Sequence, residues 1–578
     1  MAGIFATLAD RLRPAFAAVA EGADPVLRPS AQAGADFQAN GALPLAKRTG
    51  RPPAEVAAQV LAAADLDGVA TAEVHPKGFV NLRVDDAHLA TALTAMGSDP
   101  RRGVDPVARP WTVVVDYSAP NVAKEMHAGH VRTTFVGDAL CRIAGFAGHH
   151  VVRENHIGDW GTPFGMLIEH LVDLGEDAAI GELSVGDLDG FYKQARAAFD
   201  ASPDLQERAR RRVVMLQAGD AETLRLWRVL VDESMRYFHE VYRRLGVGLG
   251  PADVVGESFY NDLLPGVVDD LRAGGLLVES DGAQCVFPPG FTGRDGDPLP
   301  LIVQKSDGGF GYAATDLAAL KDRFGRLGAD RALYVVGAPQ AQHFAMCFAV
   351  GRMVGYVPEG AEPVHVQIGN MLGSDRKIFR TRSGDTVKLI DLVDEAVARA
   401  AAALAGRGHD LGDDEAAHVA EMVGVGALKY ADLSTDRARE YVFDWDRMLS
   451  FDGNSAPYLQ YAHARIQSIF RRGGVDGGAF GRGATPVTVA EPAERALALR
   501  LLGLDEAIDA ALATWSPHKL CAYLYDLAGD FTTFFEHCPV LRADDPALRA
   551  SRLELCALTA DVLASGLRLL GIEAPERM

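Results

Sequence analysis

The sequence predicts an α/β protein whose middle region holds a doubly wound parallel sheet, flanked by a small α+β unit and an all-helical region. Three observations predict this arrangement. The 578 residues are too many for one hydrophobic core, so about three domains are expected. Short apolar runs alternate with helical stretches over residues 106–400. The chain beyond residue 400 is almost entirely helical in pattern and rich in Ala and Leu.

Residues 1–105 are predicted to form the small α+β unit. Pro52 and Pro53 open a helix over residues 55–64, because proline is favoured in the first turn of a helix. Residues 79–82 are predicted to form a short strand. Residue chemistry alone identifies this region only as a folded appendage.

Residues 106–400 are predicted to form a domain of the Rossmann type. Its apolar runs are short and continuous, which is typical of strands buried in a parallel sheet. The strands are expected at residues 111–115, 151–153, 301–304, 333–336 and 364–368, with helices at 313–324 and 341–354. An insertion at about residues 170–298 is predicted to split the sheet. It contains a long helical region, 208–245, and a hairpin that joins 276–279 to 284–287 through Ser280-Asp281-Gly282.

Residues 401–578 are predicted to be all helical, with helices near 455–472 and 517–536. A stretch rich in Gly and Pro, residues 473–492, interrupts them as a loop. Composition alone does not distinguish this region from a plain helical bundle.

The composition and charge limit the class of protein. The chain is 48% hydrophobic and 23% charged, as folded globular proteins are. Its net charge of −21 argues against nonspecific coating of nucleic acid, so no DNA partner is expected. Local basic faces could still contact RNA, and the alternative is that they are simply solvated. These are Arg208, Arg210, Arg211 and Arg212 in one cluster and Arg465, Arg471 and Arg472 in another.

The sequence also favours a reduced, cytoplasmic protein. No apolar run approaches the roughly 20 residues that a membrane helix needs, and the N-terminus lacks the pattern of a signal peptide. Six cysteines are scattered without a Cys-x-x-Cys pair, so neither a disulfide framework nor a zinc knuckle is predicted, and no metal ligands are assigned.

The most informative stretch is residues 116–133, which follows the apolar run 111–115. The chain turns through Pro120, and a helix opens near Gly129 with His127 and His130 in its first turn. A helix that begins after a parallel strand is an anion site, because its first N–H groups are unpaired within the helix. Two histidines three residues apart can face one ligand. The alternative is a pair of ordinary surface histidines.

This stretch resembles the His-x-Gly-His signature of class I aminoacyl-tRNA synthetases. The longer string, from Ser118 to Lys124 and on through His127-Ala128-Gly129-His130, resembles the arginyl-tRNA synthetase version. Further resemblances lie in 36–40, which is similar to the appended N-terminal domain that touches the corner of tRNA, and in 455–472, 517–536 and the ending 569–578, which are similar to the anticodon-binding domain. Residues 154–161 and 442–446 match the family as well. The resemblance implies that the first segment shapes the pocket near the adenylate and that the second bridges the catalytic and anticodon-binding domains.

The resemblance implies an enzyme of translation that joins L-arginine to tRNA(Arg) through an arginyl-adenylate, with ATP and Mg²⁺, releasing AMP and pyrophosphate. It implies that arginine activation needs bound tRNA, and a monomer is expected. Such a reaction needs little covalent catalysis, because the protein positions the reactants and neutralises developing phosphate charge. Pro120, Lys124, His127, Gly129, His130 and Lys377 are assigned to ATP on this basis.

A second phosphate element is predicted after the strand at 364–368. Residues 373–384 carry four cations between glycines: Arg376, Lys377, Arg380 and Arg382. The segment resembles the degenerate Lys-Met-Ser-Lys-Ser loop of arginyl enzymes. Arg380 stands where lysine is usual, which replaces a point charge by a planar fork. Lys377, Arg380 and Arg382 are therefore predicted to join His127 and His130 in catalysis. A solvated basic loop is the alternative.

Residues 304–316 are predicted to choose the substrate. They leave a strand, pass a glycine-rich turn and enter a helix on which Tyr312 and Asp316 share a face. A carboxylate suits a guanidinium, which prefers bidentate pairing. The resemblance adds Asn121, Glu257 and Gln340 as arginine-binding residues. Without it, Asp316 would be read as a helix-surface carboxylate and Tyr312 as a core aromatic. No editing domain is required, since such a site rejects analogues that lack the guanidinium.

Two other interpretations stay open. One is a synthetase-like binding protein that has lost catalysis, against which the intact motifs argue. The other is a specialised paralogue of the housekeeping enzyme, which the motifs do not distinguish.

Overall fold

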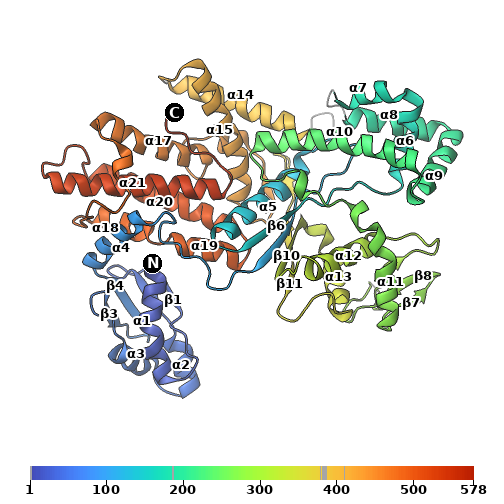
Figure 1. The fold of residues 1–578 in the computed structure, drawn as a ribbon. Helices are drawn as coiled ribbons and strands as arrows, with labels where there is room; N and C mark the ends of the chain where they lie inside the picture. Colours follow the sequence, from blue (N-terminus) through green and yellow to red (C-terminus); the bar gives the residue numbers. More distant parts are fainter. Residues whose placement is uncertain (1–2, 185–187, 294, 378, 380–386, 409) are drawn as a thin grey trace.

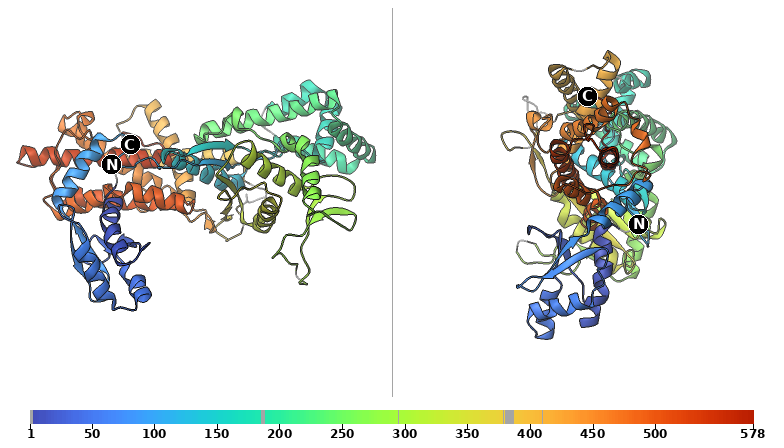
Figure 2. Two further views of the ribbon diagram at one scale, coloured as in Figure 1. Left: turned by 60° about the horizontal axis from the view of Figure 1, so that its bottom comes forward. Right: turned by 90° about the vertical axis from the view of Figure 1, so that its left-hand side faces the viewer.

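The computed structural model describes residues 3–184, 188–293, 295–377, 379, 387–408 and 410–578. The molecule is elongated. The helical C-terminal region and the N-terminal domain lie at one end, a helical arm formed by part of the insertion lies at the other, and the parallel sheet lies between them (Figures 1 and 2).

The N-terminal domain is a four-stranded sheet covered by helices. Its strand order is β1-β2-β4-β3 and every neighbouring pair is antiparallel. The predicted proline-initiated helix and the predicted strand are confirmed as α3 and β4. The elements are α1 (Ile4–Val19), β1 (Leu27–Pro29), β2 (Phe37–Ala39), α2 (Ala42–Thr49), α3 (Pro53–Ala63), β3 (Ala70–Val74), β4 (Val80–Val84) and α4 (Asp86–Ser98).

An ion-pair cluster joins this domain to the helical region. Arg495 of α18 (Pro492–Leu501) makes two hydrogen bonds of 2.7 and 2.8 Å to the Asp36 carboxylate and one of 2.7 Å to Asp86. Asp36 lies in the segment 36–40, which resembles the appended N-terminal domain of arginyl-tRNA synthetases. One residue of that segment therefore makes a contact between domains.

The central sheet is parallel, with strand order β11-β10-β5-β6. It confirms four of the predicted strands and contains β5 (Thr112–Asp116), β6 (His150–Glu154), β10 (Arg331–Gly337) and β11 (Glu362–Ile368). Successive residues of a strand point to opposite faces. Accordingly, Val113 and Val115 join the core that includes α5 (Ala128–Phe146), whereas Val114 joins the core that includes α12 (Tyr312–Gly325) and α13 (Ala341–Met353). The sheet is thus doubly wound, as predicted.

The prediction that residues 301–304 form a strand of the parallel sheet is wrong. It forms β9 (Leu301–Gln304), which pairs antiparallel with β8 (Ala283–Val286), and β8 pairs with β7 (Val278–Ser280) in the predicted hairpin. Leu301 and Val303 are buried, but Ile302 between them is 47% exposed. A run of three apolar residues therefore belongs to a strand with one open face, which its sequence does not reveal.

The helical arm comprises α6 (Pro163–Leu174), α7 (Glu176–Ser184), α8 (Leu188–Ala201), α9 (Pro203–Gln217) and α10 (Ala221–Leu245). The predicted helical region 208–245 is two helices, because Gly219 has a left-handed φ of 77° and the Asp220 side chain caps α10 by accepting from the Thr223 N–H. Helix α10 runs from the arm back to the sheet (Figure 1).

The first basic cluster divides between the interior and the surface of this arm. Arg208 forms a two-pronged pair with Asp173 at 2.7 and 2.8 Å and also contacts Glu169, and Arg212 bonds Glu169 at 2.6 Å. These two arginines therefore fasten α9 to α6 and are only partly exposed, at 30% and 16%. Arg210 and Arg211 are exposed.

The C-terminal region is helical, as predicted. It contains α14 (Leu389–Arg407), α15 (Asp413–Leu433), α16 (Trp445–Met448), α17 (Ala456–Gly473), α18, α19 (Leu504–Ala513), α20 (His518–His537) and α21 (Pro546–Leu569), and the predicted loop 473–492 contains only the short 3-10 turn η4 (Gly477–Ala479). The short strands β12 (Met371–Leu372) and β13 (Tyr441–Val442) pair in parallel, so the matched segment 442–446 begins beside the end of the sheet.

A buried ion pair fastens the helical region to the sheet. Arg132 of α5 lies 2.5 Å from Asp432 of α15 and donates to the backbone oxygens of Gly369 and Arg439 at 2.7 Å each. Both ionic side chains are almost completely buried, at 2% and 0% exposed. Among the described residues, no helix has the length and apolar character that crossing a membrane demands.

Candidate active site

The loop between β5 and α5 is strained and heavily supported. Ser118, Ala119 and Ala123 have positive φ angles of 71°, 48° and 60°, which non-glycine residues seldom adopt. Such conformations persist only where their surroundings fix them. Here the Ser118 hydroxyl lies 2.7 Å from the Tyr242 hydroxyl of α10, and the Ser234 hydroxyl accepts from the Ala123 N–H at 2.9 Å.

The two histidines cap α5. The Nδ1 atom of His127 accepts from the Gly129 N–H at 3.0 Å, and the Nδ1 atom of His130 accepts from the His127 N–H at 3.2 Å. The two ring centroids are 4.1 Å apart. Gly129 is required for this fold-back, because a Cβ there would collide with the His127 ring. The glycine of the motif therefore has a steric explanation.

Both imidazoles are neutral near pH 7. Burial lowers the pKa of His127, and burial together with His127 lowers the pKa of His130 to about 3. Since Nδ1 of each ring accepts a backbone proton, the ring's own proton is on Nε2. The pair therefore presents N–H donors without charge at the positive end of a helix, a combination suited to phosphate oxygens.

Three of the other residues predicted to bind ATP lie in this loop or in the first turn of α5. Pro120 is buried in the loop, and Gly129 and Lys124 are exposed. The Lys124 ammonium lies 4.6 Å from the Tyr192 ring centroid of α8, and the Glu125 N–H donates to Asp189 of the same helix at 3.0 Å. Helix α8 of the arm thus reaches the loop between β5 and α5, and Tyr192 and Asp189 were not identified from the sequence.

The second cationic segment is described in part. Gly373 to Lys377 form a tight turn in which the Gly373 N–H bonds the Lys377 oxygen at 2.8 Å, and Lys377 is exposed. Arg376, in that turn, has a positive φ of 60°. Arg380 and Arg382 lie outside the described residues.

The chain beyond this segment returns to the histidines. The Ala128 N–H donates to the Val387 oxygen at 2.9 Å, and the Leu389 N–H donates to the Met126 oxygen at 2.8 Å. Between them the Lys388 ammonium pairs with the Glu125 carboxylate at 2.9 Å. Residues 387–389, which follow the cationic segment in the chain, are therefore fixed against the start of α5.

A pair of carboxylates lies at the neighbouring edge of the sheet. Glu257 begins the 3-10 helix η2 (Glu257–Leu263), and Asp316 lies in the first turns of α12. Helix α12 packs against η2, and burial, Asp159 and Asp316 raise the pKa of Glu257 to about 7. Asp159 is held by the N–H and hydroxyl of Ser258 at 2.8 and 2.6 Å.

The segment 155–159 links this acidic pair to the loop between β5 and α5. Its Gly158 pairs with Asn121, and the Gly158 N–H donates to the Pro120 oxygen at 3.0 Å. A Cβ on Gly158 would collide with the Asn121 side chain. The Glu257 N–H donates to the Ile157 oxygen at 3.0 Å. One short segment therefore positions an arginine-binding candidate on each side.

The remaining predicted pocket residues are on the surface. Tyr312 starts α12 and is 77% exposed, and Gln340 is the exposed N-cap of α13. Sequence reasoning missed His343, whose Nε2 atom lies 2.5 Å from Asp316 Oδ2. Its position three residues after Gln340, on a helix that borders the pocket, was the available signal.

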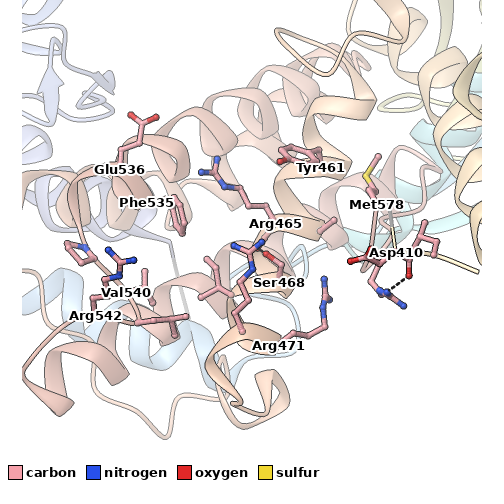
Figure 3. A pocket seen from close by; sticks show the side chains of 17 residues that line it. Asp410, Tyr461, Arg465, Ser468, Arg471, Phe535, Glu536, Val540, Arg542 and Met578 are labelled. Atoms are coloured by element: carbon pink, nitrogen blue, oxygen red, sulfur yellow. Dashed lines mark hydrogen bonds between the residues drawn. The ribbon is translucent and has the colours of Figure 1, made fainter. Parts of the chain in front are cut away.

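A cavity of about 920 Å³ lies in the C-terminal region. It is formed by α17, α20, the loop that follows α20, and the C-terminus, and it contains the whole second basic cluster: Arg465, Arg471 and Arg472 (Figure 3). The Arg465 guanidinium lies 4.3 Å from the Phe535 ring centroid. Arg577 at the same cavity donates to the Asp410 oxygen at 2.9 Å.

A parallel sheet that bears a pair of helix-capping histidines, joined to an all-helical region, defines a class I aminoacyl-tRNA synthetase architecture. Family comparison agrees: residues 100–445 match the catalytic domain of class I (R) tRNA synthetases. Residues 4–84 match the arginyl-tRNA synthetase N-terminal domain, and residues 459–578 match the DALR anticodon-binding domain. The chain belongs to the arginyl-tRNA synthetase family.

Similar proteins and structures support this membership. An arginine–tRNA ligase of Thermobifida fusca is 55% identical over 96% of this chain and 95% of its own length, and one of Cronobacter sakazakii is 48% identical over the whole of both chains. The crystal structure of arginyl-tRNA synthetase from Plasmodium falciparum matches with a TM-score of 0.86 at 27% identity and covers both chains fully. The Thermus thermophilus arginyl-tRNA synthetase matches with a TM-score of 0.82 at 26% identity, covering 99% of this chain and all of its own.

Proposed function

We propose that this chain activates L-arginine with ATP and transfers it to tRNA(Arg) for translation. One observation carries the assignment: segment 155–159 bonds both the loop that bears the histidine pair and the start of η2, where the half-buried Glu257 interacts with Asp316. Phosphate-binding donors and guanidinium-binding carboxylates therefore share one edge of a parallel sheet, where ligands of such folds bind.

In this assignment the carboxylate of arginine attacks the α-phosphorus of ATP, and pyrophosphate leaves. The Nε2–H groups of His127 and His130 donate to phosphate oxygens whose charge grows in the transition state. Lys124 and Lys377 add positive charge, together with Arg380 and Arg382. Since the groups assigned to the phosphates are donors, Mg²⁺ would be held by phosphate oxygens of ATP and would neutralise their charge.

The other end of the pocket would orient the amino acid. Asp316 and Glu257 pair with the guanidinium, and Tyr312, Asn121 and Gln340 complete the contacts. Two carboxylates around one guanidinium reject neutral side chains, because the acidic groups would then lack a cation.

The cavity among α17, α20 and the C-terminus is proposed to receive the anticodon loop. Its arginines provide phosphate contacts, and Phe535 and Tyr461 provide faces on which unpaired bases can stack. The match of residues 459–578 to an anticodon-binding domain supports this placement. A monomeric state and a cytoplasmic location stay predictions, to be checked by sedimentation and cell fractionation.

The decisive experiment measures ATP–pyrophosphate exchange and tRNA charging with each of the twenty amino acids, in the presence of total tRNA. Arginine alone should support both reactions. Exchange with another amino acid would contradict the assignment of the acidic pocket. Binding of arginine without exchange or charging would instead identify a synthetase-like protein that has lost catalysis.

A further inference from the structure

His343 of α13 contacts Asp316, the carboxylate that is proposed to bind the arginine side chain. Its Nε2 atom is 2.5 Å from Asp316 Oδ2 and 3.6 Å from the Cys347 sulfur, one turn further along α13. Helices α12 and α13 pack together, and the Phe344 ring stands edge-on to the imidazole at 5.4 Å. The side chain is 30% exposed, so its ring is held yet reaches water.

The hydrogen bond defines one proton on this ring. An ionised carboxylate only accepts, so Nε2 donates to Asp316. The second nitrogen, Nδ1, then decides the charge of the ring. The hydrogen bond to Asp316 raises the pKa of His343 and outweighs the opposing effect of burial. The carboxylate therefore favours the imidazolium, which is protonated at both nitrogens.

The other ionisable groups in this corner do not supply a competing cation. On its own helix His343 meets Cys347, and burial raises the pKa of that thiol, which keeps it neutral. From α12 it meets Asp316. Glu257 of η2 and Tyr334 of β10 interact with Asp316, and burial raises the pKa of each. Within the part of the chain that the structure describes, His343 is the cation that contacts Asp316.

We propose that, before arginine binds, the His343 imidazolium is the cation beside Asp316. Binding of arginine then releases the Nδ1 proton of His343 to solvent. This inference rests on the proposed function, because it needs Asp316 to bind arginine. A guanidinium beside the same carboxylate repels the imidazolium, and a like charge at such a distance favours the neutral ring. The neutral ring keeps its Nε2–H on Asp316, so the carboxylate stays oriented while the cation is exchanged.

The exchange would contribute to specificity. A guanidinium compensates Asp316 for the lost imidazolium, whereas a neutral ureido analogue such as citrulline does not. Citrulline would therefore leave His343 protonated. At acidic pH the imidazolium competes with arginine, so the affinity for arginine should fall as pH falls.

The test counts protons. Arginine binding is measured by calorimetry in two buffers of different ionisation enthalpy, with a chelator present because Asp316, His343 and Cys347 offer ligand atoms within 4.8 Å of one another. His343→Asn keeps an N–H donor for Asp316 but cannot be charged. It should release fewer protons than the wild type and should bind arginine relatively better on the acid side of neutrality. His418→Asn, an exposed position on α15, is the matched control and should behave as wild type.

The remaining proton release should come from Glu257 and should disappear in a Glu257→Gln variant. Equal proton release by wild type and His343→Asn would overturn the inference while leaving the proposed function intact. Absence of arginine binding in the wild type would instead refute the proposed function. If His343→Asn does not fold, nuclear magnetic resonance of the wild-type histidine rings decides: added arginine should lower the titration midpoint of one ring, and added citrulline should not.

Discussion

In the proposed function, the histidines at the start of α5 act as neutral hydrogen-bond donors. A charged imidazole would bind ATP and pyrophosphate strongly before and after the reaction, whereas an N–H donor of fixed direction strengthens its bond as phosphate charge develops. The backbone bonds to Nδ1 fix that direction, and burial holds the pKa of both rings below the ordinary value.

We expect His127→Ala to slow adenylate formation by about 10²–10³-fold, as is typical when one preorganised donor is removed. The measurement is single-turnover formation of arginyl-adenylate with tRNA present. Affinity for tRNA should be nearly unchanged, since the histidine is far along the chain from the region matched to anticodon binding. A normal rate of adenylate formation would refute the role of this ring in stabilising phosphate charge.

Asp316 should control the affinity for arginine. Asp316→Asn replaces a charged pair by a neutral contact, and the loss of a charge-assisted pair of this kind costs on the order of 10²-fold in affinity. The Michaelis constant for arginine should rise accordingly, while that for ATP should change little. An unchanged Michaelis constant for arginine would show that the pocket lies elsewhere.

Glu257 should make arginine use depend on pH. Its pKa is raised to about 7, so lowering the pH through neutrality protonates the carboxyl and removes a partner of the guanidinium. The affinity for arginine should therefore increase from acidic to basic pH and level off above the titration of Glu257. Glu257→Gln should weaken arginine binding and flatten this part of the profile. A pH profile with the same shape in wild type and variant would contradict the assignment.

At the scale of elements, two loops distant in sequence are held together at the start of α5. Residues 126–128 pair with residues 387–389, and Glu125 forms an ion pair with Lys388, so the chain that follows the cationic segment is fixed beside the start of α5. Glu125 is buried, so removal of the Lys388 ammonium takes a directly bonded cation away from a carboxylate that water hardly reaches.

We expect Lys388→Met to lower the melting temperature and to reduce adenylate formation more than it changes the Michaelis constant for arginine. The reversed pair, Glu125→Lys with Lys388→Glu, should recover part of the loss if the contact between the loops is the cause. Removal of an exposed pair, through Arg243→Ala opposite Glu240, is the control and should leave both properties unchanged. Equal effects of the control and of Lys388→Met would show that the contact has no special role.

Sequence patterns predicted most of the elements but few of their partners. The apolar runs at β5, β6, β10 and β11 are continuous because both faces of the sheet are covered. Such a run can be recognised from the sequence of each strand alone. Strand β9 has a similar run but pairs with β8, because pairing depends on residues far away in the chain. Likewise, the histidine pair was evident from its spacing, whereas the contact of His343 with Asp316 depends on how α12 packs against α13.

At the scale of the whole molecule, the domains share one hydrophobic core and are not joined by linkers alone. Core residues of the N-terminal domain, the α5 face of the sheet and the C-terminal helices form one continuous hydrophobic cluster. The buried pair of Arg132 and Asp432 joins α5 to α15 directly. Removing the residues after about 440 would therefore expose core as well as delete a tRNA surface, so truncation is a poor test of anticodon binding.

Substitution within the arginine-lined cavity is a cleaner test of how the molecule holds tRNA. The triple variant Arg465→Ala, Arg471→Ala, Arg472→Ala should raise the Michaelis constant for tRNA while arginine activation at saturating tRNA stays close to normal. For contacts to single-stranded phosphates, each lost contact lowers the slope of log affinity against log salt by about 0.7, so the slope should fall by about 2. Arg272→Ala, an exposed position on the helix α11 (Leu264–Ala273), should leave the slope unchanged. An unchanged slope in the triple variant would place the anticodon loop outside this cavity.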